Sequence, residues 1–166
     1  FAIHVYKELW QSGQEMDIAN VGYRAIESLR MEKGYLYWSG DISPDYSPLE
    51  AGLGFRVHFD LKDDFLGRQA LESQMKNGLD RKLFTFLSEQ FLPLTGGETI
   101  LESDQVVSLA TSVAYGFTVQ KTIIRGYLDR LYWGKTEFTV EVFGQRHPVK
   151  LASSPVYDPK NLALKG

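Results

Sequence analysis

The residues best suited to bind a ligand lie together in one stretch of the chain, between Gly22 and Gly54. This stretch combines aromatic residues with arginines and carboxylates. Such a set suits an amphiphilic ligand that has a ring and a charged tail, because aromatic faces cover a ring and an arginine fork holds a carboxylate. A purely structural explanation stays open, in which Arg24 pairs with Glu27 or Glu32 on a helix surface and the aromatic residues cover the core. The set comprises Arg24, Arg30, Glu32, Tyr35, Tyr37, Trp38, Asp41 and Glu50.

Other site chemistries find little support in the residue types. His4, His58 and His147 are far apart in the sequence, and none has a second ligand at metal-binding spacing, so we expect no metal site. The absence of cysteine excludes a thiol nucleophile and a disulfide framework. The serines lack the context of a nucleophile elbow, and the glycine pairs do not open a helix. We therefore expect neither a serine hydrolase nor a dinucleotide fingerprint.

Composition indicates a globular chain with an ordinary surface. Its 166 residues are 43% hydrophobic, which is enough to bury the core of one domain or of two small ones. The net charge of −3 gives no electrostatic reason to expect nucleic acid or an anionic membrane as a partner. Apolar runs are far shorter than the roughly 20 residues of a membrane-spanning helix. The chain opens on Phe1 within a helical pattern, so we expect it to begin inside a fold, with any targeting segment upstream.

The elements that must position the candidate residues are helical in the first half of the chain. Apolar residues recur there at helical spacing, and glycine, proline and asparagine mark the ends of the segments. The expected elements are, in order, a helix over 1–10 that ends near Gly13, a helix capped by Asn20 and ended by Gly34, an ordered loop over 43–54, a strand over 55–59, and a helix from Gly67 to Gly78.

The second half of the chain has a different texture, with short apolar runs separated by turn residues. Several short strands without helices predict a small barrel or sandwich. The fold class is therefore α+β, with a helix-rich region over residues 1–79 and a small antiparallel barrel or sandwich over residues 80–166. The expected strands cover residues 82–87, 99–101, 106–117, 122–127, 138–143 and 149–151.

Several motifs taken together resemble the glycine cleavage system T-protein family, the aminomethyltransferases. The runs that carry this likeness are Gly22 to Gly34, Gly40-Asp41, Ser47 to Leu53 and Phe65 to Leu71. Within that family the chain looks most similar to sarcosine dehydrogenase and its dimethylglycine dehydrogenase relatives. The segments that carry this finer likeness are Glu32 to Tyr35, Trp38, Gly116-Phe117, Lys121-Thr122 and Ser154 to Pro159.

The resemblance implies a function for the chain as part of a larger enzyme. In the dehydrogenases of this family, a folate-binding module follows a domain that holds a flavin, FAD, and oxidises an N-methyl group. Tetrahydrofolate then takes up the one-carbon unit. The family's catalytic aspartate and pterin-holding glutamate lie upstream of the segment that begins at Phe1, so we expect no catalytic residue in this chain. Residues 1–79 would be the last part of the folate-binding domain, and residues 80–166 the family's C-terminal barrel domain.

The same resemblance assigns two cofactor-binding residues. Arg24 matches a family arginine that contacts folate, and Tyr35 matches an aromatic that lies against folate in some members. Glu32 and Glu50 match patterned positions that we expect mainly to brace the loop. Two departures from the family pattern, Arg24-Ala25 in place of an arginine-aspartate step and Trp38 in place of a tyrosine, affect the details of the pocket.

Two alternatives remain open beside the dehydrogenase. One is a non-catalytic regulatory subunit similar to that of pyruvate dehydrogenase phosphatase, and the other is a stand-alone aminomethyltransferase. The expected partners are folate and an upstream flavin domain of the same chain, with no nucleic acid and no membrane. The expected location is the mitochondrial matrix for a eukaryotic source and the cytoplasm for a bacterial one.

Overall fold

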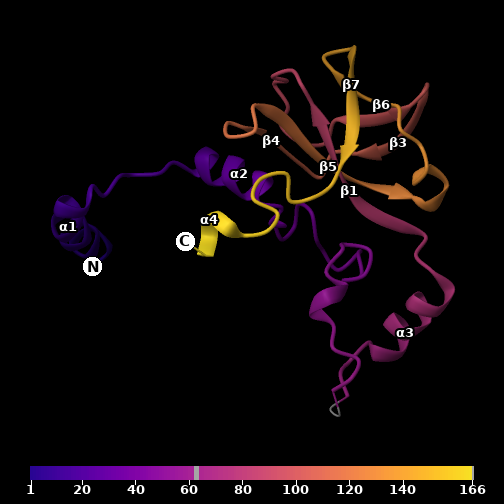
Figure 1. The fold of residues 1–166 in the computed structure, drawn as a ribbon, viewed down its shortest axis with the longest axis horizontal. Helices are drawn as coiled ribbons and strands as arrows, with labels where there is room; N and C mark the ends of the chain where they lie inside the picture. Colours follow the sequence, from indigo (N-terminus) through magenta and orange to yellow (C-terminus); the bar gives the residue numbers. More distant parts are fainter. Residues whose placement is uncertain (62–63, 166) are drawn as a thin grey trace.

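The computed structural model describes residues 1–61 and 64–165, and it shows a helical first half followed by a curled antiparallel sheet (Figure 1). The α+β class predicted from the sequence is confirmed. The helices are α1 (Ala2–Gly13), α2 (Tyr23–Glu32), α3 (Arg68–Asn77) and the short α4 (Leu162–Lys165). The strands are β1 (Arg81–Ser88), β2 (Thr99–Glu102), β3 (Gln105–Leu109), β4 (Ser112–Gly116), β5 (Lys121–Asp129), β6 (Phe138–Val142) and β7 (Gln145–Ala152).

The strands form one seven-stranded sheet in the order β3-β2-β6-β7-β1-β5-β4. All of the neighbouring strands are antiparallel. The sheet curls so that β3 comes back against β5 at Gly126. A Cβ atom at Gly126 would lie 2.7 Å from the Ser108 hydroxyl and 2.8 Å from Ile100, so only glycine permits this approach.

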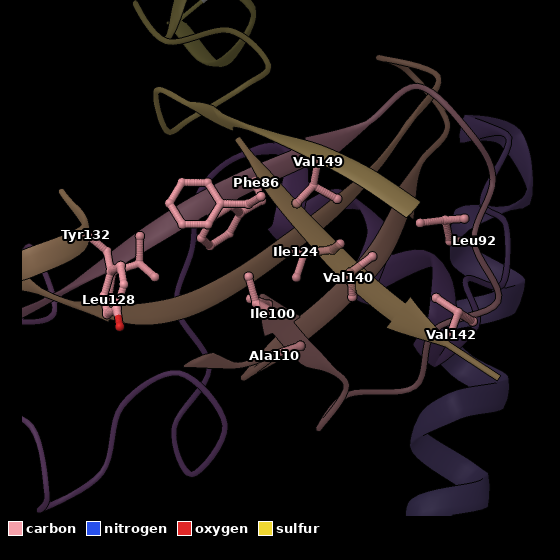
Figure 2. Packing of buried hydrophobic residues seen from close by; sticks show 11 residues of the cluster. Phe86, Leu92, Ile100, Ala110, Ile124, Leu128, Tyr132, Val140, Val142 and Val149 are labelled. Atoms are coloured by element: carbon pink, nitrogen blue, oxygen red, sulfur yellow. The ribbon is translucent and has the colours of Figure 1, made fainter. Parts of the chain in front are cut away.

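The hydrophobic core lies inside the curled sheet (Figure 2). Alternating residues of each strand point inward, as the period of a β-strand requires. Phe86 of β1 and Phe138 of β6 meet edge to face at 5.3 Å between ring centroids. The cluster comprises Phe86, Leu92, Ile100, Ala110, Ile124, Leu128, Tyr132, Phe138, Val140, Val142 and Val149.

The helices of the first half contribute little to this core. Helix α1 stands apart from the sheet, and an extended segment connects it to α2 (Figure 1). The predicted N-cap of the second helix is wrong, because Gly22 occupies that position and the Asn20 amide bonds the Tyr6 hydroxyl instead, at 3.1 Å. The third helix begins after Gly67 and ends before Gly78, as predicted.

Two predicted strands differ from the structure. Residues 55–59 form no strand, because backbone bonds from Arg56 to Leu53 and from Val57 to Gly54 wind this segment into a 3₁₀ turn. The run over 106–117 is two strands, β3 and β4, rather than one. The chain crosses between the edges of the sheet there, since the Ala110 amide bonds Glu98 and the Thr111 amide bonds Arg125.

Candidate functional site

Helix α2 packs against β4 and carries the first of the candidate residues. The Ser28 hydroxyl donates to the Tyr115 carbonyl at 2.7 Å, and the buried residues of α2 are Ser28, Met31 and Glu32. These residues fall on one side of the helix because positions three and four apart share a face. The contact fixes α2 on the sheet. Most of the candidate site residues lie at and after the C-terminal end of this helix.

Helix α2 ends in a glycine motif that places Tyr35. The Tyr35 amide donates to the Arg30 carbonyl at 2.9 Å, and the Gly34 amide donates to the Met31 carbonyl at 3.3 Å. This is the Schellman arrangement, which needs a left-handed residue after the helix, and Gly34 has φ of +78°. A side chain at Gly34 would also meet Ser154 at 2.7 Å, so the C-terminal segment packs against this turn.

The loop after Tyr35 winds around the buried carboxylate of Asp41. Its Oδ2 accepts from Arg30 Nη1 at 2.8 Å and from the Tyr37 amide at 3.0 Å, while its Oδ1 accepts from the Thr111 hydroxyl at 2.8 Å. Arg30 also bonds Glu27 through Nη2 at 2.6 Å. Asp41 therefore ties the loop to α2 and to the sheet.

A second arginine enters this cluster from the sheet. Arg125 of β5 is 1% exposed, and its Nη1 donates to the Tyr35 carbonyl at 2.8 Å and to Asp41 Oδ2 at 3.3 Å. Burial lowers the pKa of Arg125, and the neighbouring Asp41 carboxylate opposes that shift. Arg30 and Arg125 face Glu27 and Asp41, so two positive charges are matched by two negative ones.

The sequence interpretation missed Arg125. A signal was present, because this arginine interrupts the apolar run from Ile123 to Leu128. A charged residue within a buried strand requires a partner, yet its partner Asp41 lies 84 positions away in the sequence. Only the folded chain identifies that partner.

A cavity of about 430 Å³ opens beside Tyr35, between α2 and the C-terminal segment that ends in α4. Its charged lining residues already have partners within the protein: Arg30 pairs with Asp41, Lys33 Nζ pairs with Asp158 at 2.7 Å, and Glu32 accepts from backbone amides. Such a cavity suits an uncharged ring. The lining residues are Ile26, Leu29, Arg30, Glu32, Lys33, Tyr35, Tyr157, Asp158, Ala163 and Leu164.

Glu50 braces the loop as the sequence led us to expect, whereas the Glu32 carboxylate braces a turn of the sheet. Glu32 Oε1 accepts from the amides of Thr118 and Val119, at 2.7 and 3.1 Å, at the turn between β4 and β5. Glu50 accepts from the Ser47 amide at 2.8 Å and from Arg81 Nε at 3.1 Å. The Ser47 hydroxyl accepts from the Glu50 amide in return, which is a capping-box pair inside the loop over 43–54.

Arg24 lies at the other end of α2 from Tyr35. Its side chain is exposed, and it forms no hydrogen bond or ion pair with the residues that the structure describes. Arg24 does not line the cavity, and the helix between these two residues is about 15 Å long, at ~1.5 Å per residue. The structure therefore does not bring the two predicted folate-binding residues together. A single ligand touching both would have to extend along α2.

The neighbour of Arg24, Tyr23, belongs to the same end of the helix. Hydrogen bonds with Tyr37 and with Glu27 raise the pKa of Tyr23 to about 12. Tyr37 in turn lies under Arg30, whose guanidinium carbon is 5.4 Å from the ring centroid.

Other kinds of site are not found in the described part of the chain. No group of three or more histidine, cysteine, aspartate or glutamate residues among residues 1–61 and 64–165 could hold a metal ion. Across those same residues, no helix combines the length and the apolar character needed to cross a membrane. A further cavity of about 490 Å³ between the loop near Leu49 and α3 contains none of the predicted site residues.

Comparison with known families identifies the class of protein. Residues 1–61 match the GCVT N-terminal domain, and residues 81–158 match the glycine cleavage T-protein C-terminal barrel domain. A crystal structure of glycine cleavage system aminomethyltransferase T from Bartonella henselae has the same fold, with a TM-score of 0.73 at 24% identity over 81% of this chain and 38% of that one. The chain belongs to the glycine cleavage T-protein family.

Three individual proteins illustrate which members of the family the chain is similar to. Sarcosine dehydrogenase, mitochondrial, from Mus musculus is 38% identical over 98% of this chain. Dimethylglycine dehydrogenase, mitochondrial, from Mus musculus is 32% identical over 92% of it. The pyruvate dehydrogenase phosphatase regulatory subunit, mitochondrial, from Mus musculus is 30% identical over 94%. The chain spans only 18%, 18% and 20% of these three relatives, respectively.

Proposed function

We propose that this chain is the folate-binding part of a flavin-dependent dehydrogenase that oxidises sarcosine or dimethylglycine and passes the one-carbon unit to tetrahydrofolate. On this proposal, FAD is held by an upstream domain of the same polypeptide, which is also the partner of this region. The chain by itself is then not catalytic. A eukaryotic parent would act in the mitochondrial matrix and a bacterial one in the cytoplasm. We also propose that the folate-binding domain ends at residue 79 and that the barrel domain begins at residue 80.

The observation that carries the proposal is the cavity beside Tyr35. Its walls combine an aromatic ring with aliphatic side chains, and the charged groups around it are bonded to partners within the protein. These residues fit the uncharged ring of a folate, which aromatic contact stabilises. The exposed guanidinium of Arg24, which has no partner among the residues that the structure describes, fits a carboxylate of the ligand's tail, because a bidentate charge-assisted bond fixes its orientation as well as its charge. Tetrahydrofolate, when bound, supplies the acceptor for the one-carbon unit.

A titration of the full-length protein with tetrahydrofolate under anaerobic conditions tests the two residues. We expect Tyr35→Ala and Arg24→Ala each to raise the Kd by about tenfold, the equivalent of one lost interaction of 1.4 kcal/mol. Arg146→Ala is the matched control, since Arg146 is an exposed arginine on β7 that pairs with Asp104. An unchanged Kd in a folded variant would remove that residue from the site.

The visible spectrum of the full-length protein tests the parent activity. A bound flavin bleaches when it accepts electrons, so anaerobic addition of sarcosine or dimethylglycine should bleach it and identify the amine. The similarity to a phosphatase regulatory subunit supports a second candidate, a non-catalytic regulator. A flavin that stays oxidised with both amines would favour that regulator. A folded protein without flavin would favour a stand-alone aminomethyltransferase.

A further inference from the structure

Arg125 holds the backbone of Tyr35 from a different element of the fold. The Tyr35 amide is fixed by Arg30 at the end of α2, and the Tyr35 carbonyl is fixed by Arg125 Nη1 at 2.8 Å from β5. Both backbone polar groups of this one residue are therefore bound, while its side chain stays 55% exposed at the cavity. A clamped backbone with an open side chain is the arrangement of a pre-organised ligand contact.

Arg125 occupies a position where burial of its charge carries a large desolvation cost. It is 1% exposed, and its Nη2 atom has no partner among the described residues. Its neighbours Ile123 and Ile124 are fully buried and apolar. Apolar side chains of similar volume commonly replace buried ion pairs without loss of stability, so stability alone does not explain an arginine here.

The ion pairs around Arg125 show what the arginine adds. Asp41 keeps Arg30, the Thr111 hydroxyl and the Tyr37 amide as partners without it. The Tyr35 carbonyl, in contrast, has Arg125 as its hydrogen-bond donor. The feature that depends most on Arg125 is the position of Tyr35.

We propose that Arg125 is a positioning residue that sets Tyr35 in place for the ligand of the adjoining cavity. The inference rests on the proposed folate-binding function. It assigns Arg125 no contact with folate: the guanidinium acts through the Tyr35 backbone, and β5 of the barrel thereby controls the shape of the cavity next to α2.

A double-mutant cycle in the full-length protein tests the inference, with tetrahydrofolate as the titrated ligand under anaerobic conditions. We expect Arg125→Met to raise the Kd by about tenfold in the native background and by less than about twofold in a Tyr35→Ala background. Thr122→Val is the control, because Thr122 is equally buried in β5 but bonds Gln90 and Leu92. It should leave the Kd unchanged.

Arg125→Lys covers the case in which Arg125→Met does not fold. Lysine keeps a positive charge beside Asp41 but replaces the rigid planar guanidinium, whose Nη1 bonds both Asp41 and the Tyr35 carbonyl, with an ammonium on a flexible stem. We expect it to retain the midpoint of thermal unfolding within a few degrees and still to weaken folate binding. Native affinity in Arg125→Lys would overturn the inference, and so would equal effects of Arg125→Met in the two backgrounds. No effect of Tyr35→Ala alone would remove Tyr35 from the proposed site, and the positioning role with it.

Discussion

The two halves of the molecule differ in how far they bury their apolar residues. The cluster of eleven core residues lies wholly between Phe86 and Val149, inside the curled sheet. Helix α1 buries only Gly13, and α3 buries none of its residues. Large side chains such as Ile3 and Leu66 are exposed to 73% and 104%. The barrel therefore makes its own core, whereas the helices carry apolar surface that the described residues do not cover.

The junction between the two halves differs from both of them, because ion pairs and hydrogen bonds between charged residues connect it. Arg30 and Asp41 of the first half meet Arg125 of the second, and Glu50 of the first half meets Arg81 of the second. Such contacts are directional and demand correct geometry, unlike apolar packing. The comparison teaches that the barrel supplies stability and that the charged junction places the site residues.

The strongest test of this contrast is a large-to-small change on each side. Phe86→Ala removes a fully buried ring and should lower the free energy of unfolding by about 3–5 kcal/mol. Phe55→Ala removes a ring that is 69% exposed and should change it by less than about 0.5 kcal/mol. Urea unfolding followed by circular dichroism measures both. Equal losses would mean that the two halves form one core.

The charged junction is tested next by neutralising its centre. Asp41→Asn keeps the shape of the side chain but leaves Arg30 and the buried Arg125 without their shared carboxylate. Breaking a buried pair in this way should cost roughly 3 kcal/mol. Asp45→Asn is the control, since the Asp45 side chain is exposed and, among the described residues, accepts only from the nearby Ser43 hydroxyl. If Asp41→Asn proved as mild as the control, charge would not hold the junction.

A smaller, pH-dependent effect is expected where the C-terminal segment meets α2. The hydrogen bond from Lys33 lowers the pKa of Asp158 below its ordinary value of 3.8. A lowered folded-state pKa stabilises the fold above the ordinary value, and this contribution disappears as the pH falls through the folded-state pKa. The unfolding midpoints of the native chain and Asp158→Asn should therefore differ at neutral pH and converge in acid. A difference that did not shrink as the pH fell from neutral into the acid range would contradict this pairing.

The sequence revealed these elements unevenly, for physical reasons. Alternating apolar residues and turn residues are local signals, so β1, β2, β6 and the helix over 68–77 were predicted within a residue or two of their ends. The break at Ala110 and Thr111 depends on which distant strands those amides bond, and no local pattern records that choice. Residues 55–59 have strand-forming side chains, but no strand in the described part of the chain pairs with them.

The site was less accessible to prediction than the fold. The glycine after α2 marked where Tyr35 would sit, because a helix-ending glycine motif is a local feature. Glu32 and Glu50 were expected to brace the loop; Glu50 does so, and the Glu32 carboxylate bonds the turn between β4 and β5 instead. Arg125 could not be assigned a partner, since its carboxylate and its carbonyl come from a loop in the other half of the chain. The binding roles of Arg24 and Tyr35 stay predictions until a ligand is titrated.

The smallest expected effect comes from a substitution on the exposed apolar face of α1, which tests whether another part of the protein covers that face. Ile3→Ser replaces an exposed apolar residue of α1, so in this chain alone it should alter the free energy of unfolding by less than about 0.5 kcal/mol. In the full-length polypeptide we expect a loss of about 1 kcal/mol or more, because an upstream part of the same domain would bury that side chain. Thermal unfolding of both lengths, with Lys7→Ser as an exposed control on the same helix, measures the difference. A loss confined to the longer protein would show that the exposed face of α1 is an interface within one polypeptide, and equal, negligible losses would show that this face stays exposed in the full-length protein as well.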